Sequence, residues 1–555
     1  MKPQATYQKL RGGYYTPSNI ASFLSTWAVR SAGDIVLEPS CGDGAFLEAT
    51  ASRLLELGTA PQSLSSQIIG CEIDVREAQR AVDRLAELGI EKRNIQVYAG
   101  DFFSRTASKD GDWYFDAVVG NPPFVRYQNF PEEQRAYAFS VMRSTGLHPN
   151  RLTNAWVPFI VAAALRLKPK GRLAMVAPAE LLQVNYAAEL RLFLSKYFSQ
   201  ITVLTFRGLP FDGIQQEVVL LLASREDTSR SGIELLELNS SVDLLRYEPA
   251  SFGRNGFKTI DHGTEKWTQY YLSQEEIELV RTLGTRPDIG RFGDVAETDI
   301  GVVTGMNDVF VLTEEQVREN RLENFARRLV SRSAHLPGIL FRVADWRTNA
   351  NAGQKVYLLD VPPSQERCEM PDGLERYLHS AESRNLHRGY KCRIRKRWYV
   401  VPSVYVPEAF MLRQIHHYPK LISNQGSATC TDTIHRVRFH RRTNRARCCA
   451  AFLNSLTFSF SEILGRSYGG GVLELEPNEA NLLPLPLSGA GRLNPLEIDA
   501  LVRANQIEKV LDITDEVLLA EGLGLSKDQI RVLRGIWIKL RNRRTGRRNE
   551  PTEKN

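Results

Sequence analysis

The amino-acid sequence predicts an α/β fold, with helices on both faces of a sheet, followed by a mixed, largely β C-terminal region. Through about residue 225, apolar runs of strand length alternate with helical segments, which is typical of βαβ units. From 290 to 490, short β-like runs are separated by turn signals instead. The domains predicted from these patterns are 1–225, a linker and helical connection at 226–289, a domain at 290–494, and a helical segment with a basic tail at 495–555.

The first predicted strand begins near Ile35 and ends in the glycine-rich turn 38–44 (EPSCGDG). Glycines let a ligand approach the backbone, and the helix that follows offers free N–H groups. Glu38 and Asp43 would repel a pyrophosphate but attract a cation. S-adenosylmethionine carries a sulfonium and an ammonium, so the turn favours that cofactor over a dinucleotide.

The next two predicted strands also end in acidic residues. Glu72, at the end of the second strand, is placed to accept hydrogen bonds from ribose hydroxyls, because Asp74 can cap the next helix. Asp101, after the third strand, can accept from the adenine amine of the cofactor, and Phe102 can supply an apolar wall or an N–H. Ligands of open parallel sheets bind at the carboxyl ends of the strands, so these acids indicate a single site.

The fourth predicted strand, 115–120, ends in Asn121-Pro122-Pro123-Phe124. Two consecutive prolines remove two N–H donors, so the strand stops and its carbonyls point away from any ladder. An amide, free carbonyl acceptors and an aromatic ring suit a planar amino group such as the exocyclic amine of adenine. An isolated tetrapeptide of this kind is more often a simple strand-ending turn, but here three earlier strand ends carry acids.

With these four strand ends, the chain resembles the TaqI-type, gamma-class N6-adenine DNA methyltransferases of restriction–modification systems. Residues 12–17 (GGYYTP) match the N-terminal cofactor motif of that family, and a helix is expected from Ser18 with Thr16 or Ser18 as its cap. The order of the motifs, with a long C-terminal region last, is the gamma order. Three further segments look like recurring pieces of the family's DNA-recognition region: 303–310, 453–455 and 468–471.

The resemblance implies a Rossmann-like class I methyltransferase sheet of about seven strands and a C-terminal target-recognition domain. It implies S-adenosylmethionine as the cofactor, double-stranded DNA as the substrate, and no metal. The residues implied in cofactor binding are Tyr15, Thr16, Pro17, Glu38, Ser40, Cys41, Gly42, Glu72, Ile73, Asp101, Phe102 and Asn121. The expected activity is therefore that of a site-specific, adenine-specific DNA methyltransferase.

The chemistry of the target amine suggests roles for the tetrapeptide. The Asn121 side-chain oxygen and the Pro122 carbonyl are expected to accept both amino hydrogens of a flipped-out adenine, which exposes the lone pair of N6. Phe124 is expected to stack on the base, although tyrosine is commoner there in the family. Phe211, in the loop 208–213, is the second aromatic wall that the resemblance implies; alternatively it folds back on the core.

Three stretches are strongly cationic and nearly free of acids: 384–399, 436–447 and 539–548. Aromatic residues are interleaved in the first two, which favours contact with a DNA backbone. Alternation in the first stretch would put its arginines on one face of a strand. The residues expected to contact DNA are Arg393, Arg395, Arg397, Arg441 and Arg442. The last stretch is expected to be a solvated or disordered terminus.

Composition agrees with a cytoplasmic enzyme, and the resemblance implies a nucleoid-associated protein of prokaryotic type. The net charge of +7 is mild for 555 residues, and the seven cysteines are scattered without the CxxC pair that would suggest zinc. No signal peptide opens the chain, and no apolar run has membrane-spanning length. We expect a monomer. A cognate restriction endonuclease would be a separate protein, since the chain opens almost directly on the Thr-Pro element.

Other functions fit parts of the pattern. N4-cytosine methylation also uses an exocyclic amine, but serine or aspartate more often begins its tetrapeptide. RNA and protein-glutamine methyltransferases carry related tetrapeptides, but they are usually compact and lack such a long C-terminal half. A fused restriction–modification enzyme would need a nuclease motif, and a non-catalytic DNA-binding module would not need the cofactor residues.

Overall fold

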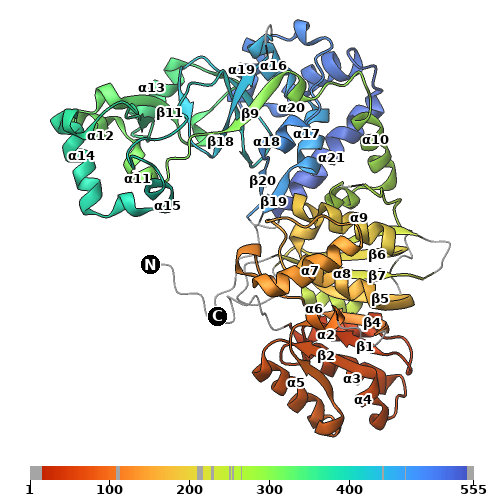
Figure 1. Cartoon of the computed structure of the whole chain (residues 1–555). Coiled ribbons are helices and arrows are strands. Elements are labelled where there is room, and N and C mark those ends of the chain that lie inside the picture. Colours follow the sequence, from red (N-terminus) through yellow and green to blue (C-terminus); the bar gives the residue numbers. More distant parts are fainter. Residues whose placement is uncertain are drawn as a thin grey trace. The chain divides into compact units, whose positions relative to one another are not determined.

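The computed structural model describes residues 16–107, 113–208, 217–226, 231–248, 252, 256–263, 265–440, 443–468 and 470–546. The chain divides into two compact units (Figure 1). Unit 1 comprises Met1–Gln274 with Glu550–Asn555, and unit 2 comprises Glu275–Asn549. The division lies within 226–289, the segment predicted to be a linker and helical connection, and the finer domain boundaries stay predictions.

Unit 1 contains an eight-stranded sheet in its described part, with the strand order β3-β2-β1-β4-β5-β7-β6-β8. Only β7 runs antiparallel to its neighbours β5 and β6; the other pairs are parallel. The strands are β1 (Val36–Glu38), β2 (Ile68–Glu72), β3 (Gln96–Ala99), β4 (Phe115–Gly120), β5 (Leu167–Pro178), β6 (Gln200–Phe206), β7 (Val218–Ser224) and β8 (Gly232–Leu238). The predicted α/β fold is confirmed. The eighth strand lies in the segment predicted as a linker.

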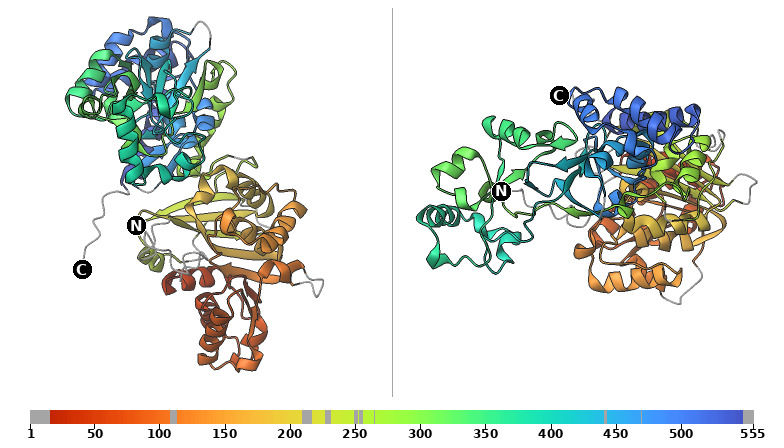
Figure 2. Two further views of the ribbon diagram at one scale, coloured as in Figure 1. Left: turned by 60° about the vertical axis from the view of Figure 1, so that its left-hand side comes forward. Right: turned by 90° about the horizontal axis from the view of Figure 1, so that it is seen from above.

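Helices cover both faces of this sheet (Figures 1 and 2). The helices of unit 1 are α2 (Ser18–Ala28), α3 (Ala45–Glu56), α4 (Leu64–Gln67), α5 (Val75–Glu87), α6 (Phe102–Ala107), α7 (Glu132–Ser144), α8 (Trp156–Leu165) and α9 (Ala188–Tyr197). Helices α2, α3 and α5 share one apolar cluster with Val36, Ala117 and Val119. The intervening strand residues Leu37 and Val118 are equally buried, as expected for a parallel sheet covered on both sides.

One local expectation in unit 1 is wrong. The N-cap of α2 is Pro17, with no side-chain cap from Thr16 or Ser18, because proline, whose ring fixes φ, precedes the first helical residue. The segment 125–150 contains the helix α7, whose first turn carries two glutamates that favour a helix N-terminus.

Unit 2 is mixed, as predicted. Its sheets have the orders β12-β16-β14-β18-β9, β10-β13-β11-β17 and β15-β20-β19. The strands are β9 (Ala296–Ile300), β10 (Val311–Leu312), β11 (Ala326–Val330), β12 (Leu340–Phe341), β13 (Tyr357–Leu359), β14 (Ala409–Leu412), β15 (Gln414–Ile415), β16 (Leu421–Asn424), β17 (Thr429–Cys430), β18 (Ile434–Phe439), β19 (Arg466–Tyr468) and β20 (Val472–Glu474).

The helices of unit 2 are α10 (Gln274–Gly284), α11 (Asn307–Phe310), α12 (Glu314–Glu319), α13 (Val343–Asn351), α14 (Asp372–Ser383), α15 (Tyr390–Arg393), α16 (Arg445–Ala451), α17 (Ser455–Leu464), α18 (Pro477–Asn481), α19 (Pro495–Arg503), α20 (Ile507–Thr514) and α21 (Lys527–Gly546). In the region 302–401, α11, α12, α14 and α15 pack with β10, β11 and β13 around an apolar cluster of their own. No helix in the described ranges is both long and apolar enough to cross a membrane.

The basic tail is a folded element as far as it is described. Residues 539–546 belong to α21, which packs along α17. Arg544 is buried and forms an ion pair with Glu462 of α17. The expectation of a solvated or disordered terminus is therefore wrong for 539–546, because a buried partner on a distant helix holds the chain in place.

Candidate functional site

The site is a rim at one edge of the unit 1 sheet, where β3, β2, β1 and β4 end side by side. The glycine-rich turn 38–44 bridges two neighbouring strand ends. The Gly42 N–H donates to Glu72 Oε2 over 2.9 Å, and Ser40 Oγ donates to the backbone carbonyl of Asn121 over 3.4 Å. The structure thus brings the acidic turn, the end of β2 and the tetrapeptide together, as the sequence predicted.

The turn needs its glycines for conformation and for packing. Gly42 and Gly44 have φ of +51° and +90°, the left-handed region that favours glycine. A β-carbon on Gly44 would lie 2.9 Å from Ala81 Cα, so the start of α3 lies directly against α5. Asp43 does not face a ligand as expected, because Arg84 of α5 pairs with it over 2.6 Å.

Glu38, at the end of β1, is the most unusual acid on the rim. Its side chain is only 2% exposed, and Oε2 has no hydrogen-bond partner within the described residues. Burial raises the pKa of this carboxyl well above its usual value, and the charges of Glu72 and Asp43 raise it further. A buried carboxylate with an unpaired oxygen fits a cationic group such as the ammonium of S-adenosylmethionine.

At the end of β2, Asp74 is the helix cap, as predicted, and Glu72 is left for another role. Asp74 caps α5 by accepting from the Arg76 N–H over 2.9 Å. Glu72 accepts from the Gly42 and Asp74 N–H groups, and burial raises the pKa of its carboxyl. Ile73, between them, is a large apolar side chain that lies exposed at the rim.

The end of β3 differs in part from the expectation. Asp101 accepts from the Ser104 N–H over 2.8 Å at the start of α6, and burial raises the pKa of its carboxyl. The Phe102 ring is buried and stacks on Phe159 of α8, with centroids 5.7 Å apart and an interplanar angle of 17°. Phe102 therefore does not offer its ring as a wall, which leaves its backbone N–H for that position.

The tetrapeptide is held on both sides. Asn121 Nδ2 donates to Thr16 Oγ1 over 3.2 Å, so the amide nitrogen faces the N-terminal element and the amide oxygen lies at the opposite end. A β-carbon on Gly120 would lie 3.4 Å from Glu38 Cγ, which shows how closely β4 approaches the acidic turn. Pro122 is buried, and Phe124 is half-buried against the apolar cluster of α2 and α3. Tyr15 and Phe211 lie outside the described residues.

Sequence reasoning missed the residues that hold the chain after the tetrapeptide. Asn154 Oδ1 accepts from the Tyr127 N–H over 3.2 Å, and its Nδ2 donates to the Tyr186 hydroxyl over 3.0 Å. The Tyr186 hydroxyl in turn donates to Glu180, next to the end of β5. The Ala155 N–H donates to the Val125 carbonyl over 2.9 Å. An asparagine just before a helix is predicted to be an N-cap. No signal in the sequence distinguished Asn154 from an ordinary N-cap.

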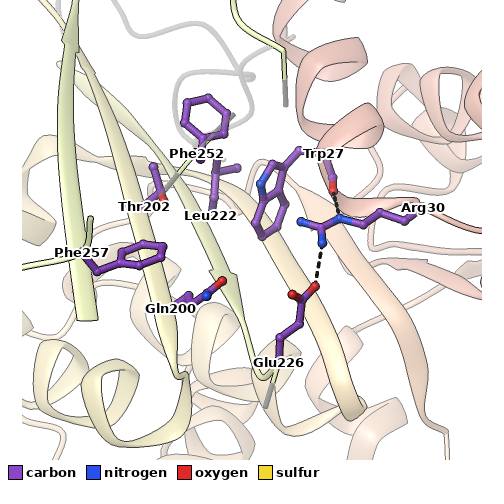
Figure 3. A pocket seen from close by; sticks show the side chains of 8 residues that line it. All are labelled: Trp27, Arg30, Gln200, Thr202, Leu222, Glu226, Phe252 and Phe257. Atoms are coloured by element: carbon purple, nitrogen blue, oxygen red, sulfur yellow. Dashed lines mark hydrogen bonds and ion pairs between the residues drawn. The ribbon is translucent and has the colours of Figure 1, made fainter. Parts of the chain in front are cut away.

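Two cavities of unit 1 lie at the opposite edge of the sheet. One of about 280 Å³ lies where β6 begins and β7 ends, and Figure 3 shows Trp27 and Arg30 on one side of it and Phe257 on the other. Arg30 pairs with Glu226 over 2.6 Å there. A second, of about 350 Å³, borders Arg225, also beyond the end of β7. Neither cavity contains a residue of the predicted site.

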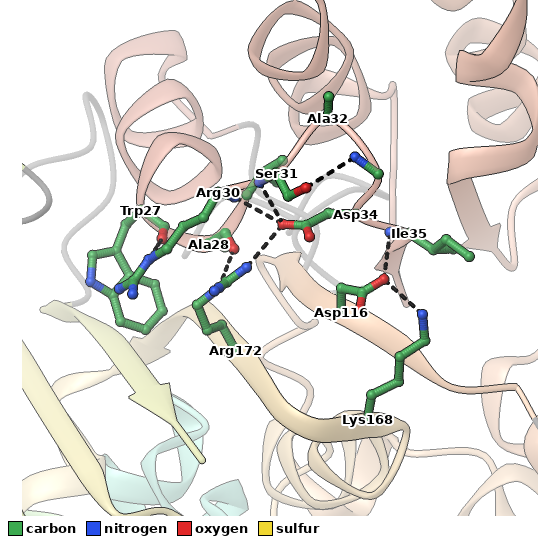
Figure 4. Close-up of polar contacts among 12 residues, drawn as sticks. Trp27, Ala28, Arg30, Ser31, Ala32, Asp34, Ile35, Asp116, Lys168 and Arg172 are labelled. Atoms are coloured by element: carbon green, nitrogen blue, oxygen red, sulfur yellow. Dashed lines mark hydrogen bonds and ion pairs between the residues drawn. The ribbon is translucent and has the colours of Figure 1, made fainter. Parts of the chain in front are cut away.

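Polar side chains at that opposite edge satisfy one another (Figure 4). Asp34 accepts from the Arg30 N–H and from Arg172 Nη2, each over 2.9 Å. Asp116 accepts from the Ile35 N–H and from Lys168 Nζ, each over 2.8 Å. These bonds tie the starts of β1, β4 and β5 together. Internal pairing of these side chains differs from the rim, where Glu38 Oε2 has no partner within the described residues.

The arginines predicted to contact DNA do not share a strand face. Arg393 ends the short helix α15, and the turn that follows holds Arg395 and Arg397. Arg395 donates to the Val303 and Thr304 carbonyls, and Arg397 donates to the carbonyls of 363 and 365. Both guanidinium groups therefore hold neighbouring loops, and only Arg393 is exposed. Arg441 and Arg442 lie outside the described residues.

The segment 453–455 also has a structural role. Asn454 caps α17, and Ser455 donates to Asp515 from both its N–H and its hydroxyl. All three of its residues are buried, so they hold the helices of unit 2 rather than face a duplex. In the segment 468–471, Gly471 accepts from Arg544 over 2.7 Å.

Two family models match separate parts of the chain, similar to its division into units 1 and 2. Residues 2–233 match the family model of N-6 DNA methylases, and residues 264–519 match the model of the C-terminal domain of the Type II methyltransferase M.Eco57I. The first match contains every predicted cofactor and tetrapeptide residue. The second contains Arg393, Arg395 and Arg397.

Similar curated proteins are Type II methyltransferases. M.AccI of Acinetobacter calcoaceticus is 20% identical over 492 residues, and M.XamI of Xanthomonas campestris pv. amaranthicola is 22% identical over 492 residues. Each alignment covers 86% of this chain and 85% of the relative. Among solved structures, the Type IIL restriction-modification enzyme MmeI in complex with DNA is similar in fold, with a TM-score of 0.58 and 14% identity over 95% of this chain and 75% of that one.

Proposed function

We propose that the chain is a gamma-class-like Type II methyltransferase of a restriction–modification system, and that it methylates N6 of an adenine extruded from duplex DNA. The observation that carries the proposal is the contact of the acidic turn with the tetrapeptide, through Ser40 and the Asn121 carbonyl. A methyl donor and a planar amine held on these two elements would be neighbours. Fold and family together imply S-adenosylmethionine as the donor.

Three strand ends would hold the cofactor. Glu38 would face its ammonium, Glu72 its ribose, and Asp101 with the Phe102 N–H its adenine. Ile73 would cover the adenine ring from the exposed side of the rim. The bound cofactor supplies the electrophilic methyl group, and the chain orients the acceptor toward it.

The tetrapeptide would hold the target amine. Adenine N6 is a poor nucleophile because its lone pair is delocalised into the ring. Asn121 Oδ1 and the Pro122 carbonyl would accept both amino hydrogens. This arrangement favours a pyramidal nitrogen with an exposed lone pair. Positioning of this kind can contribute roughly 7–11 kcal/mol, and the N6 proton can leave to water once the nitrogen is cationic.

Glu38→Gln is expected to weaken cofactor binding and to stabilise the cofactor-free protein. A hydrogen bond to a charged group contributes about 1.5–3 kcal/mol, so the dissociation constant should rise roughly tenfold or more. A raised carboxyl pKa means that stability is fully present below the ordinary value of 4.5 and falls as pH rises through the higher folded value. Glutamine removes that fall, so the cofactor-free Tm should be higher than wild type at neutral pH.

Titration calorimetry with S-adenosylmethionine and thermal unfolding across pH measure both effects. Glu56→Gln, on the exposed side of α3, is the matched control and should change neither. Wild-type cofactor affinity in Glu38→Gln would refute the assignment of Glu38.

Phe124→Ala is expected to weaken base extrusion. Unstacking a base costs a few kcal/mol, and stacking on an aromatic ring offsets roughly 1–3 kcal/mol of it. Fluorescence of 2-aminopurine at the target position should rise less with the alanine variant than with the wild type. Phe124→Tyr keeps the ring and should behave as wild type. Equal fluorescence for the alanine variant would show that Phe124 does not hold the base.

Transfer of labelled methyl groups to plasmid DNA, RNA and protein tests the activity itself. Sequencing of genomic DNA from cells with and without the protein would locate N6-methyladenine and reveal the recognition sequence. N4-methylcytosine, or label in RNA or protein alone, would contradict the proposal.

We further propose that the protein acts as a monomer in the cytoplasm at the nucleoid, and that a cognate endonuclease is a separate protein.

A further inference from the structure

A short helix in unit 2 presents two large apolar side chains to solvent. Tyr390 begins α15 and is 64% exposed, and Ile394 follows its end and is 59% exposed. Residues four apart in a helical turn lie on the same face, so the ring and the aliphatic chain are neighbours. Exposed pairs of this size on a folded domain mark contact surfaces more often than single exposed residues do.

Positive charge surrounds this pair. The segment 384–398 contains no acidic residue. Four of its cations are exposed next to the apolar pair: Arg388, Lys391, Arg393 and Lys396. We call residues 388–396 the α15 tip. A polyanion is the partner whose charge complements this surface.

The tip is held rigidly from behind. Arg395 Nη2 donates to the Val303 and Thr304 carbonyls over 2.9 and 2.8 Å, and its guanidinium lies 5.7 Å from the centre of the Phe310 ring. Cys392, between the exposed residues, is fully buried in the apolar cluster of the region 302–401. Arg395 therefore contacts the domain beneath the tip, whereas the neighbouring side chains face solvent.

Close approach of the neighbouring loop explains the glycine in 303–310. Gly305 has a φ of +79°, and a β-carbon there would lie 2.7 Å from Lys391 Cβ. Only glycine lets this loop lie against α15 while Arg395 reaches the two carbonyls before it. The loop and the tip therefore form one element, although about eighty-five residues separate them in sequence.

We propose that the α15 tip is a DNA-contacting element of unit 2, an inference that rests on the proposed function. Its four cations contact phosphates, and Tyr390 and Ile394 contact base edges and sugars in the groove between them. Phosphate contacts position a protein on DNA, and apolar side chains inserted beside bases add a contact that a charged surface alone lacks. Arg395 is a positioning residue that presents the tip.

The test compares binding of fluorescent mixed-sequence duplex DNA by full-length variants. The double variant Tyr390→Ala/Ile394→Ala should lose about tenfold or more in affinity, because two apolar side chains no longer bury surface against the duplex. Tyr390→Phe keeps the ring and should bind as wild type. Leu496→Ala, a residue of α19 that is 65% exposed, is the matched control and should change nothing.

The salt dependence of DNA affinity distinguishes the contribution of the cations from that of the apolar pair. Lys391→Gln and Arg393→Gln should each reduce the slope of log affinity against log salt by about 0.9, as expected for one lost phosphate contact. The alanine double variant should keep the wild-type slope. All variants should retain the wild-type Tm and affinity for S-adenosylmethionine, because the changed side chains are exposed and lie outside unit 1.

Two outcomes would overturn the inference. If the double variant and the two glutamine variants bind duplex DNA as Leu496→Ala does, the tip is not a DNA contact, even if the protein methylates DNA. If the apolar pair proves necessary for binding another protein and not DNA, the partner class is wrong. Failure of the wild type to bind any duplex would overturn the proposed function as well.

Discussion

Asn121→Ala is expected to abolish methyl transfer while the protein still binds duplex DNA. Its amide oxygen is the acceptor proposed to face the target amine, because Nδ2 donates to Thr16 Oγ1 over 3.2 Å. Removal of one preorganised hydrogen-bonding group from a site where charge develops typically costs about 10²–10³ in kcat. Alanine also releases the link to the N-terminal element, so the loss should lie at or above that range.

Single-turnover methylation and DNA affinity, measured on the same preparations, separate chemistry from binding. Asn129→Ala is the matched control, because Asn129 is exposed in the same segment and lies five residues beyond the tetrapeptide. It should leave both quantities unchanged. Turnover near the wild-type value in Asn121→Ala would exclude the proposed role, and a parallel loss of DNA affinity would assign the residue to binding instead.

Arg544→Ala is expected to destabilise unit 2 by about 3–5 kcal/mol, because it leaves the buried carboxylate of Glu462 without its partner. Both side chains are 2% exposed, and Arg544 Nη2 lies 2.8 Å from Glu462 Oε1. Arg544 Nη1 also donates to the Gly471 carbonyl over 2.7 Å. Removal of the arginine therefore breaks contacts with α17 and with the turn before β20.

Denaturant unfolding measures this effect. Arg531→Ala is the control on the same helix, because its ion pair with Asp528 lies in solvent, where such pairs contribute about 0–1 kcal/mol. The double variant Arg544→Met/Glu462→Leu should recover part of the loss, since it leaves no unpaired charge. If Arg544→Ala is no less stable than Arg531→Ala, the tail does not anchor the unit.

Local sequence patterns were sufficient to predict the rim of the site. Prolines end β4 at the tetrapeptide, glycines shape the turn after β1, and an acid follows β2 and β3. Strand order in a parallel sheet then places these ends side by side, so Glu38, Glu72 and Asn121 meet as expected. The prediction that failed locally was the cap of α2, where a proline occupies the position expected for a polar side chain.

By itself, the sequence determined the α/β class of unit 1, its cofactor-type turn and the place of the tetrapeptide, because these depend on residues close in the chain. Tertiary structure alone decided which charges face solvent. Arg395, Arg397 and Arg544 lie in basic stretches of the kind that contact DNA. In the structure, however, they donate to backbone carbonyls or pair with a carboxylate of distant segments. Pairing of a charge depends on neighbours far away in sequence, and the charge pattern along the chain does not record them.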